Sequence, residues 1–174
     1  HACLTELCYH RFGGSSEIAK VFGDHILLSP RGFSWHFVAH EWSHAEMRKR
    51  LTIRAWLKLP QWFDDGVAVV VSEAPEHSVE HFKYLQSKGI NVPSPEELYT
   101  FESLSQWVDA IIKYGDNLNP VRRKNGEEEY HVLYSSVANE VARWVEKNGV
   151  NGLQNLIERL NANETFSAVY KSQQ

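Results

Sequence analysis

The sequence predicts one α+β domain, in which a small sheet near the N-terminus is followed by a largely helical remainder. Two short segments rich in Ile, Val, Phe and Leu, residues 17–22 and 25–29, have the composition typical of strands. Residues 35–51 contain neither Gly nor Pro, and helical patterns dominate the second half of the chain. The 174 residues suit one compact domain, with little room for two.

The two predicted strands are close enough in the sequence to form a hairpin. Gly23 and Asp24 separate them, and Gly supplies the positive φ that a two-residue hairpin turn needs. Residues 30–32, Pro-Arg-Gly, then end the second strand. We place Ser34 as the N-cap of the helix predicted over 35–51, whose last turn carries three cations that favour the C-terminal end of the helix dipole.

The apolar segment 67–71, Val-Ala-Val-Val-Val, does not reveal its structure by itself. Its β-branched residues favour a strand, but a short buried helix gives the same pattern of apolar residues. The polar residues 116–129 are predicted to form a loop. The remaining helices are predicted over 94–98, 103–114, 130–147, 151–160 and 166–170, with a break at Asn148-Gly149.

Composition excludes some classes of protein and leaves the compartment open. With 18 Lys and Arg against 22 Asp and Glu, the formal charge of −4 does not favour nucleic acid or anionic lipid as a partner. No apolar stretch is long enough to predict a membrane span. Cys3 and Cys8 can form a disulfide or remain thiols, so the compartment is not fixed, although an extracytoplasmic one, periplasmic or secreted, is favoured. Because the chain begins with His1 rather than Met, we expect a processed product or a fragment, of unknown oligomeric state.

The most informative motif is His40-Glu41-Trp42-Ser43-His44. On a helix, His40 and His44 project from the same face, close enough for both rings to bind one metal ion. Glu41 is offset by about 100° around the helix, from where its carboxylate can take a proton from a water that zinc acidifies. This is the H-E-x-x-H arrangement of zinc proteases. His36 lies on the same stripe, but it is about 12 Å from His44 along the helix axis and is predicted to be a flanking or core residue.

A third metal ligand must come from another element. The metzincin extension would place Gly and His at positions where this chain has Met47 and Arg50, which excludes that class. Residues 60–68, Pro-Gln-Trp-Phe-Asp-Asp-Gly-Val-Ala, resemble instead the gluzincin group of zinc metallopeptidases, especially its minimal bacterial members of the peptidase MA type. In these proteins a pattern like Pro-x-Trp-(Phe/Leu)-x-Glu-Gly-x-Ala supplies the third ligand. The resemblance assigns that position to Asp65.

Asp65 departs from the family, which usually has Glu at this position. An Asp carboxylate also binds zinc, but its shorter stem requires the two helices to approach more closely. Asp64 is the main competitor for the third ligand, with capping of the helix as its structural alternative. Glu73, His77 and His81 are weaker alternatives.

The resemblance also implies a fold, a mechanism and a mode of substrate binding. It implies a zincin-like domain over 1–174, in which a small mixed sheet and the metal-binding helices, 17–75, lie above a helical lower part, 94–170, with the cleft between them. One Zn²⁺ and Glu41 as general base would hydrolyse peptide bonds, and Tyr134 would stabilise the oxyanion, although Tyr130 and His131 lie close to it in the sequence. A peptide or protein substrate would add as a strand along Asp24–Ser29.

Two other functions remain open at this point. The Asp at position 65 motivates a catalytically silent zincin-fold module for binding or assembly, but Glu41 argues against it because a purely structural zinc needs no general base. A zinc hydrolase that acts on a non-peptide substrate has the same sequence features as a peptidase. Pocket walls depend on tertiary structure, so the sequence does not predict substrate specificity.

Overall fold

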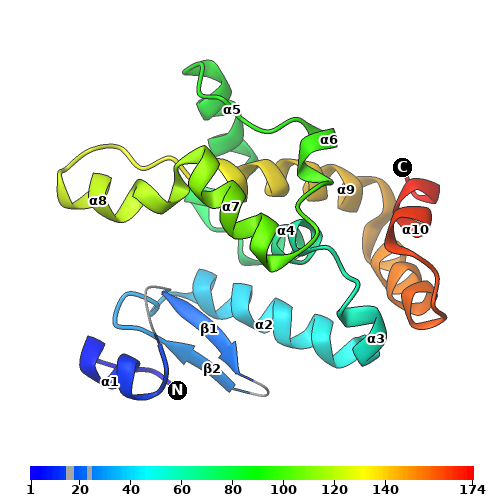
Figure 1. The fold of residues 1–174 in the computed structure, drawn as a ribbon, viewed down its shortest axis with the longest axis horizontal. Coiled ribbons are helices and arrows are strands. Elements are labelled where there is room, and N and C mark those ends of the chain that lie inside the picture. Colours follow the sequence, from blue (N-terminus) through cyan, green and yellow to red (C-terminus); the bar gives the residue numbers. More distant parts are fainter. Residues whose placement is uncertain (15–17, 23–24) are drawn as a thin grey trace.

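In a computed structural model, the protein consists of helices that cover one side of a long helix, α2, and a small sheet on its other side (Figure 1). The structure describes residues 1–14, 18–22 and 25–174. This arrangement confirms the α+β class at a coarse level. The elements are α1 (Glu6–Arg11), β1 (Ala19–Phe22), β2 (His25–Leu28), α2 (Trp35–Arg50), α3 (Ile53–Trp56), α4 (Gln61–Ser72), η1 (Pro75–His77), α5 (Val79–Ser87), α6 (Pro95–Leu98), α7 (Leu104–Tyr114), η2 (Asp116–Leu118), α8 (Asn119–Lys124), α9 (Val132–Asn161) and α10 (Phe166–Ser172).

The sheet is smaller than predicted. β1 and β2 pair antiparallel, from Ala19 opposite Leu28 to Phe22 opposite His25. The predicted turn residues Gly23 and Asp24, and the predicted strand start at residue 17, lie outside the described residues. The expected mixed sheet is reduced to this pair plus one isolated parallel bridge in the described part of the chain, because the N-terminal segment contributes only a single bridging residue to β2.

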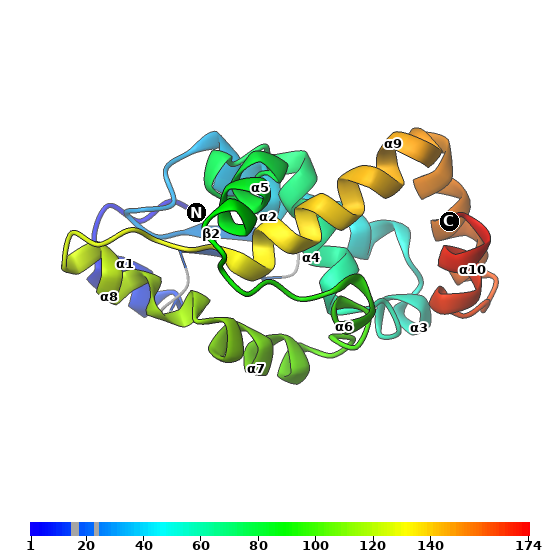
Figure 2. The ribbon, with the colours of Figure 1, turned by 90° about the horizontal axis from the view of Figure 1, so that it is seen from above.

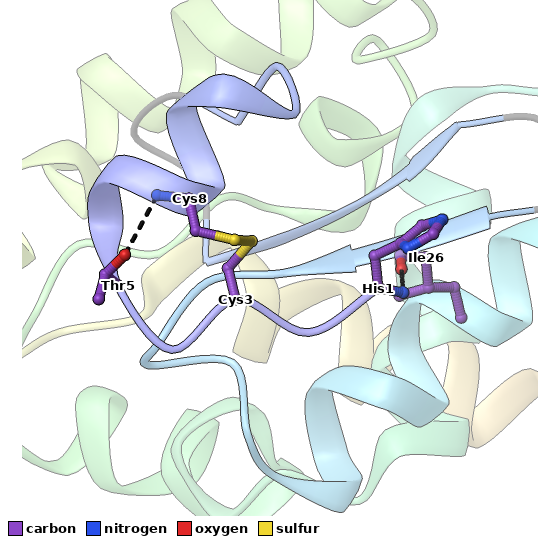
Figure 3. The surroundings of a disulfide bond; sticks show 5 residues. All are labelled: His1, Cys3, Thr5, Cys8 and Ile26. Atoms are coloured by element: carbon purple, nitrogen blue, oxygen red, sulfur yellow. Dashed lines mark hydrogen bonds between the residues drawn. A yellow bond between two sulfur atoms is a disulfide. The ribbon is translucent and has the colours of Figure 1, made fainter.

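The N-terminal segment His1–Cys3 lies along the outer edge of β2. The Leu28 amide donates to the His1 carbonyl oxygen (2.8 Å), and the Cys3 amide donates to the Leu28 carbonyl oxygen (3.0 Å). Cys3 also forms a disulfide with Cys8 of α1, so the disulfide, and not the pair of free thiols, is the form present (Figure 3). The bond ties α1, which the sequence analysis did not predict, to the segment that pairs with β2.

The observed bounds of α2, Trp35–Arg50, agree with the predicted range 35–51 to within one residue. The Ser34 hydroxyl accepts from the Phe37 amide and caps the helix, and the three predicted cations lie in its last turn. α4 also settles the ambiguous segment 67–71, which is helical. Burial explains why β-branched residues are accepted there, because α4 packs against both α2 and α9 and its side chains at 67–69 are buried.

The close contact between α4 and α9 depends on Gly66. A Cβ at this position would lie 2.4 Å from Val141 Cγ2 and 3.3 Å from the Val137 carbonyl oxygen. Trp62 and Phe63, one turn earlier on α4, are almost completely buried in the main core. α4 is therefore fixed between its two neighbours over most of its length.

The second half of the chain is largely helical, as predicted. The predicted break at Asn148-Gly149 is confirmed, because α9 is interrupted at Gly149, which has φ 62° and ψ −168°, and α10 lies beside the C-terminal end of α9 (Figure 2). The predicted loop over 116–129 was wrong, because its first part forms η2 and α8. The Asp116 carboxylate there accepts from the backbone amides of Val132 (2.9 Å) and Leu133 (3.0 Å), so this segment caps the start of α9.

We predict that Gly66→Ala destabilises the protein by about 1–3 kcal/mol, because the added methyl group overpacks the contact with Val141. The free energy of unfolding is measured by urea denaturation followed by circular dichroism. As a control, Gly66→Ala combined with Val141→Ala should be less destabilised than the sum of the two single changes. A Gly66→Ala variant as stable as the parent would contradict this description of the α4–α9 contact.

Candidate metal centre

The structure brings His40, His44 and Asp65 together. His40 Nε2 and His44 Nε2 are 3.1 Å apart, and Asp65 Oδ1 is 3.7 Å from the first and 3.9 Å from the second. One ligand atom from each residue lies within 4.8 Å of the other two, and no other such group of three is found in the described part of the chain. Two imidazoles and a carboxylate that converge in this way fit a zinc ion with a fourth position left open.

The two helices place these side chains directly. His40 and His44 are four residues apart on α2 and therefore share its face toward α4. Asp65 projects from α4 and is 5% exposed. Since α2 and α4 pack closely together, the short Asp side chain reaches the two histidines.

Gln61 and Asp64 support the group from α4. The Gln61 side-chain amide donates to Asp65 Oδ2 (2.6 Å), which leaves Oδ1 directed at the histidines. Asp64 Oδ2 lies 2.9 Å from His44 Nδ1, on the opposite side of the ring from Nε2. A carboxylate that accepts from Nδ1–H fixes the ring and leaves the Nε2 lone pair for a metal ion. The structure thus places Asp64, the predicted competitor, behind His44, and gives Gln61 a supporting role that was not predicted from the sequence.

The pKa values show how strongly the three groups are coupled. Burial, and then the charge of His44, lower the pKa of His40 to about 3. Burial also lowers the pKa of His44, but the hydrogen bond and charge of Asp64, with Asp65 and Glu41, outweigh it and raise the value to about 9. Burial raises the pKa of Asp65 to about 6, against the opposing effects of His44 and Gln61. A proton on His44 therefore occupies the position where a metal ion would bind.

Glu41 and Tyr134 line a cavity of about 290 Å³ beside this group. His40 is also part of its wall, and the ring of Tyr134 is 6.4 Å from the ring of His40. Burial, and then the charge of Asp65, raise the pKa of Tyr134, so its hydroxyl remains protonated at neutral pH. The carboxylate of Glu41, the phenol of Tyr134 and one member of the metal group, His40, therefore line the same cavity.

The other histidines considered in the sequence are not members of the metal group, although His36 and His77 line the same cavity as His40. His36 Nδ1 is 2.6 Å from the Ser72 carbonyl oxygen and donates to it, in agreement with a flanking role. Glu73 is exposed at the C-terminal end of α4. His77 and His81 lie instead near His131, which sequence reasoning named only as a neighbour of Tyr134.

No model of a known protein family, no curated protein and no solved structure matches this chain. Within the described residues, no helix combines the length and apolar character needed to cross a membrane.

We predict that zinc affinity increases with pH, because a proton on His44 competes with the ion for Nε2. With the pKa of His44 raised to about 9, the affinity should rise by up to about tenfold per pH unit between about pH 7 and pH 9 and level off above about pH 9. Protonation of Asp65, with its pKa of about 6, should weaken binding further at lower pH. Equilibrium dialysis with metal analysis measures this dependence.

Asp64→Asn is the matched control for the pH series. It removes the carboxylate that raises the pKa of His44, so the affinity should reach its plateau at a lower pH. A parent affinity that does not change with pH would contradict the protonation state assigned to His44.

Proposed function

We propose that the protein is a zinc-dependent peptidase of the gluzincin type, with a zincin-like arrangement of α2, α4 and the lower helices. The observation that carries this proposal is the convergence of His40, His44 and Asp65 next to the cavity that Glu41 lines. A purely structural metal site has no need of a carboxylate placed beside its open position. His40 Nε2, His44 Nε2 and Asp65 Oδ1 would hold the ion.

In this proposal each residue of the site has a separate role in catalysis. When bound, zinc supplies Lewis-acid chemistry that acidifies water and polarises a carbonyl group. The Glu41 carboxylate takes the proton of the attacking water and passes it to the leaving amine. The Tyr134 hydroxyl, kept protonated by burial, donates to the oxyanion that develops on the scissile carbonyl. Asp64 and Gln61 hold His44 and Asp65 in position.

An extended peptide is the substrate that the sheet can bind, but β1 suits it better than the predicted strand 24–29. The outer edge of β2 is already paired with His1–Cys3. Because Leu28 directs its backbone groups to that segment, its partner Ala19 directs its own away from β2 in the alternating antiparallel pattern. Ala19 also lines the cavity beside Glu41. A peptide added along β1 would therefore reach the candidate site.

No observation favours the alternatives over the peptidase. The shorter Asp side chain, which motivated a silent binding module, does not keep Asp65 out of the group. A non-peptide substrate would use the same metal, general base and phenol. Measured cleavage of peptides, together with the zinc content, distinguishes a peptidase from these two alternatives.

We predict that Glu41→Gln keeps its zinc and loses at least about a hundredfold in kcat/KM, because the amide cannot act as a base. The measurement is cleavage of a quenched fluorescent peptide library, with the zinc content determined on the same samples. Glu46→Gln is the matched control, since Glu46 lies on the same helix and pairs with Arg50 at the surface; it should keep full activity.

Two results would count against this proposal. Full activity of Glu41→Gln would remove Glu41 as the general base. A zinc-loaded parent that binds peptides of the library without cleaving them would favour the binding module, and one that cleaves only non-peptide esters or amides would favour the other hydrolase.

A further inference from the structure

A second group of histidines lies near the candidate metal centre. His77 at the end of η1, His81 on α5 and His131 just before α9 come from three separate elements, and we call them the second histidine cluster. Their ring centroids are 4.7 Å apart for His77 and His131, and 6.1 Å for His81 and His131. All three line a cavity of about 240 Å³, together with Glu76, Glu129 and Arg123.

The nitrogen atoms of two members have the separation expected of metal ligands. His77 Nε2 is 3.2 Å from His131 Nδ1, close to the 3.1 Å between the Nε2 atoms of His40 and His44. Two imidazole nitrogens bound to one tetrahedral zinc at 2.0–2.1 Å would be about 3.4 Å apart. The pair can thus bind one ion with little movement of either ring.

The charges around the cluster favour a cation. Two arginines, Arg123 and Arg31, lie near the cluster and act on the Glu129 carboxylate. Glu129 pairs with Arg123 through two hydrogen bonds of 2.7 and 2.6 Å. The same carboxylate lies 3.7 Å from His131 Nε2, on the side of the ring opposite His77. It stabilises a proton on Nε2, so Nδ1 carries the lone pair. The Asn119 side-chain amide nitrogen approaches the same atom at 3.4 Å, and a bound ion would replace this long contact. Burial lowers the pKa of His77 and His131, so both rings are neutral, as metal binding requires.

His81 supplies the third nitrogen only after a change in its position. Its Nε2 now lies 3.5 Å from the backbone amide nitrogen of His131 and accepts from it. Rotation of this half-buried ring would turn Nε2 from that amide toward the other two histidines. Because this change costs free energy, the cluster should bind more weakly than the group of His40, His44 and Asp65, whose ligand atoms already converge.

We propose that His77, His131 and His81 form a second and weaker site for a zinc-class divalent cation, in the cavity of about 240 Å³ that they line. The proposal does not rest on peptidase activity, because it concerns metal binding by other residues. His77 also stacks on Tyr134, with ring centroids 4.9 Å apart. An ion bound to His77 would therefore contact the wall of the cavity that Glu41 and Tyr134 line.

The test counts zinc ions by equilibrium dialysis and elemental analysis. A variant with His40→Ala and His44→Ala removes the first group, and we expect it to keep one weakly bound zinc ion per chain. Adding His77→Gln or His131→Gln should reduce the affinity for that ion at least about tenfold. Adding His25→Ala, which changes an exposed histidine on β2, should leave it unchanged. Circular dichroism shows whether each variant is folded.

Two results would overturn the second site. One is the absence of zinc from the folded His40→Ala, His44→Ala variant when zinc is offered in excess. The other is zinc binding by that variant that His77→Gln and His131→Gln leave unchanged. If the double variant does not fold, the parent still decides, since it should bind two zinc ions and a folded His131→Gln variant only the tighter one.

Discussion

The packing of α4 between α2 and α9 is the constraint on which the rest of the structure depends. Gly66 permits the close contact with α9, and the adjacent residue, Asp65, turns toward α2. Sequence neighbours on one helix thus set its position and supply the acidic group of the candidate metal centre. If α4 moved away from α2, the short Asp side chain would no longer reach the histidines, whereas a Glu side chain is one methylene longer and would still reach them after a small shift.

The same packing makes the candidate centre electrostatically demanding. A buried carboxylate and two imidazoles, whose nitrogens are 3.1 Å apart, cannot all adopt their preferred charge states without a shared proton or cation. The atoms that point away from the centre of the group have hydrogen-bond partners: Asp65 Oδ2 accepts from Gln61, and His44 Nδ1 donates to Asp64. The remaining atoms, His40 Nε2, His44 Nε2 and Asp65 Oδ1, face one another, which is the arrangement that a bound cation stabilises best.

Local signals in the sequence predicted some elements well and failed where tertiary contacts decide. α2 was predictable from its N-cap and its last-turn cations, but 67–71 was not, because burial on two sides outweighs the strand propensity of Val. α8 was missed because its residues are polar, although Pro120 in its first turn is a signal of a helix start. α5 was missed too, although the Ser78 hydroxyl caps it through the His81 amide.

The sequence predicted the three residues that the structure brings together, since motif spacing fixes a helix face and the family pattern indicated Asp65. It could not pair Asp64 with His44 or bring His131 near His77, because those contacts join distant segments. The contact of Gln61 with Asp65 lies within one helix at a spacing of four residues, which is a signal that the sequence does contain. Zinc binding itself stays a prediction. Its most direct test is elemental analysis of the parent, Asp65→Ala and Asp64→Ala after dialysis against one equivalent of zinc. We predict one tightly bound zinc ion in the parent, no zinc bound with that affinity in Asp65→Ala, and binding weakened about 10–100-fold in Asp64→Ala. Zinc bound by Asp65→Ala as tightly as by the parent, or a parent that binds none, would contradict this prediction.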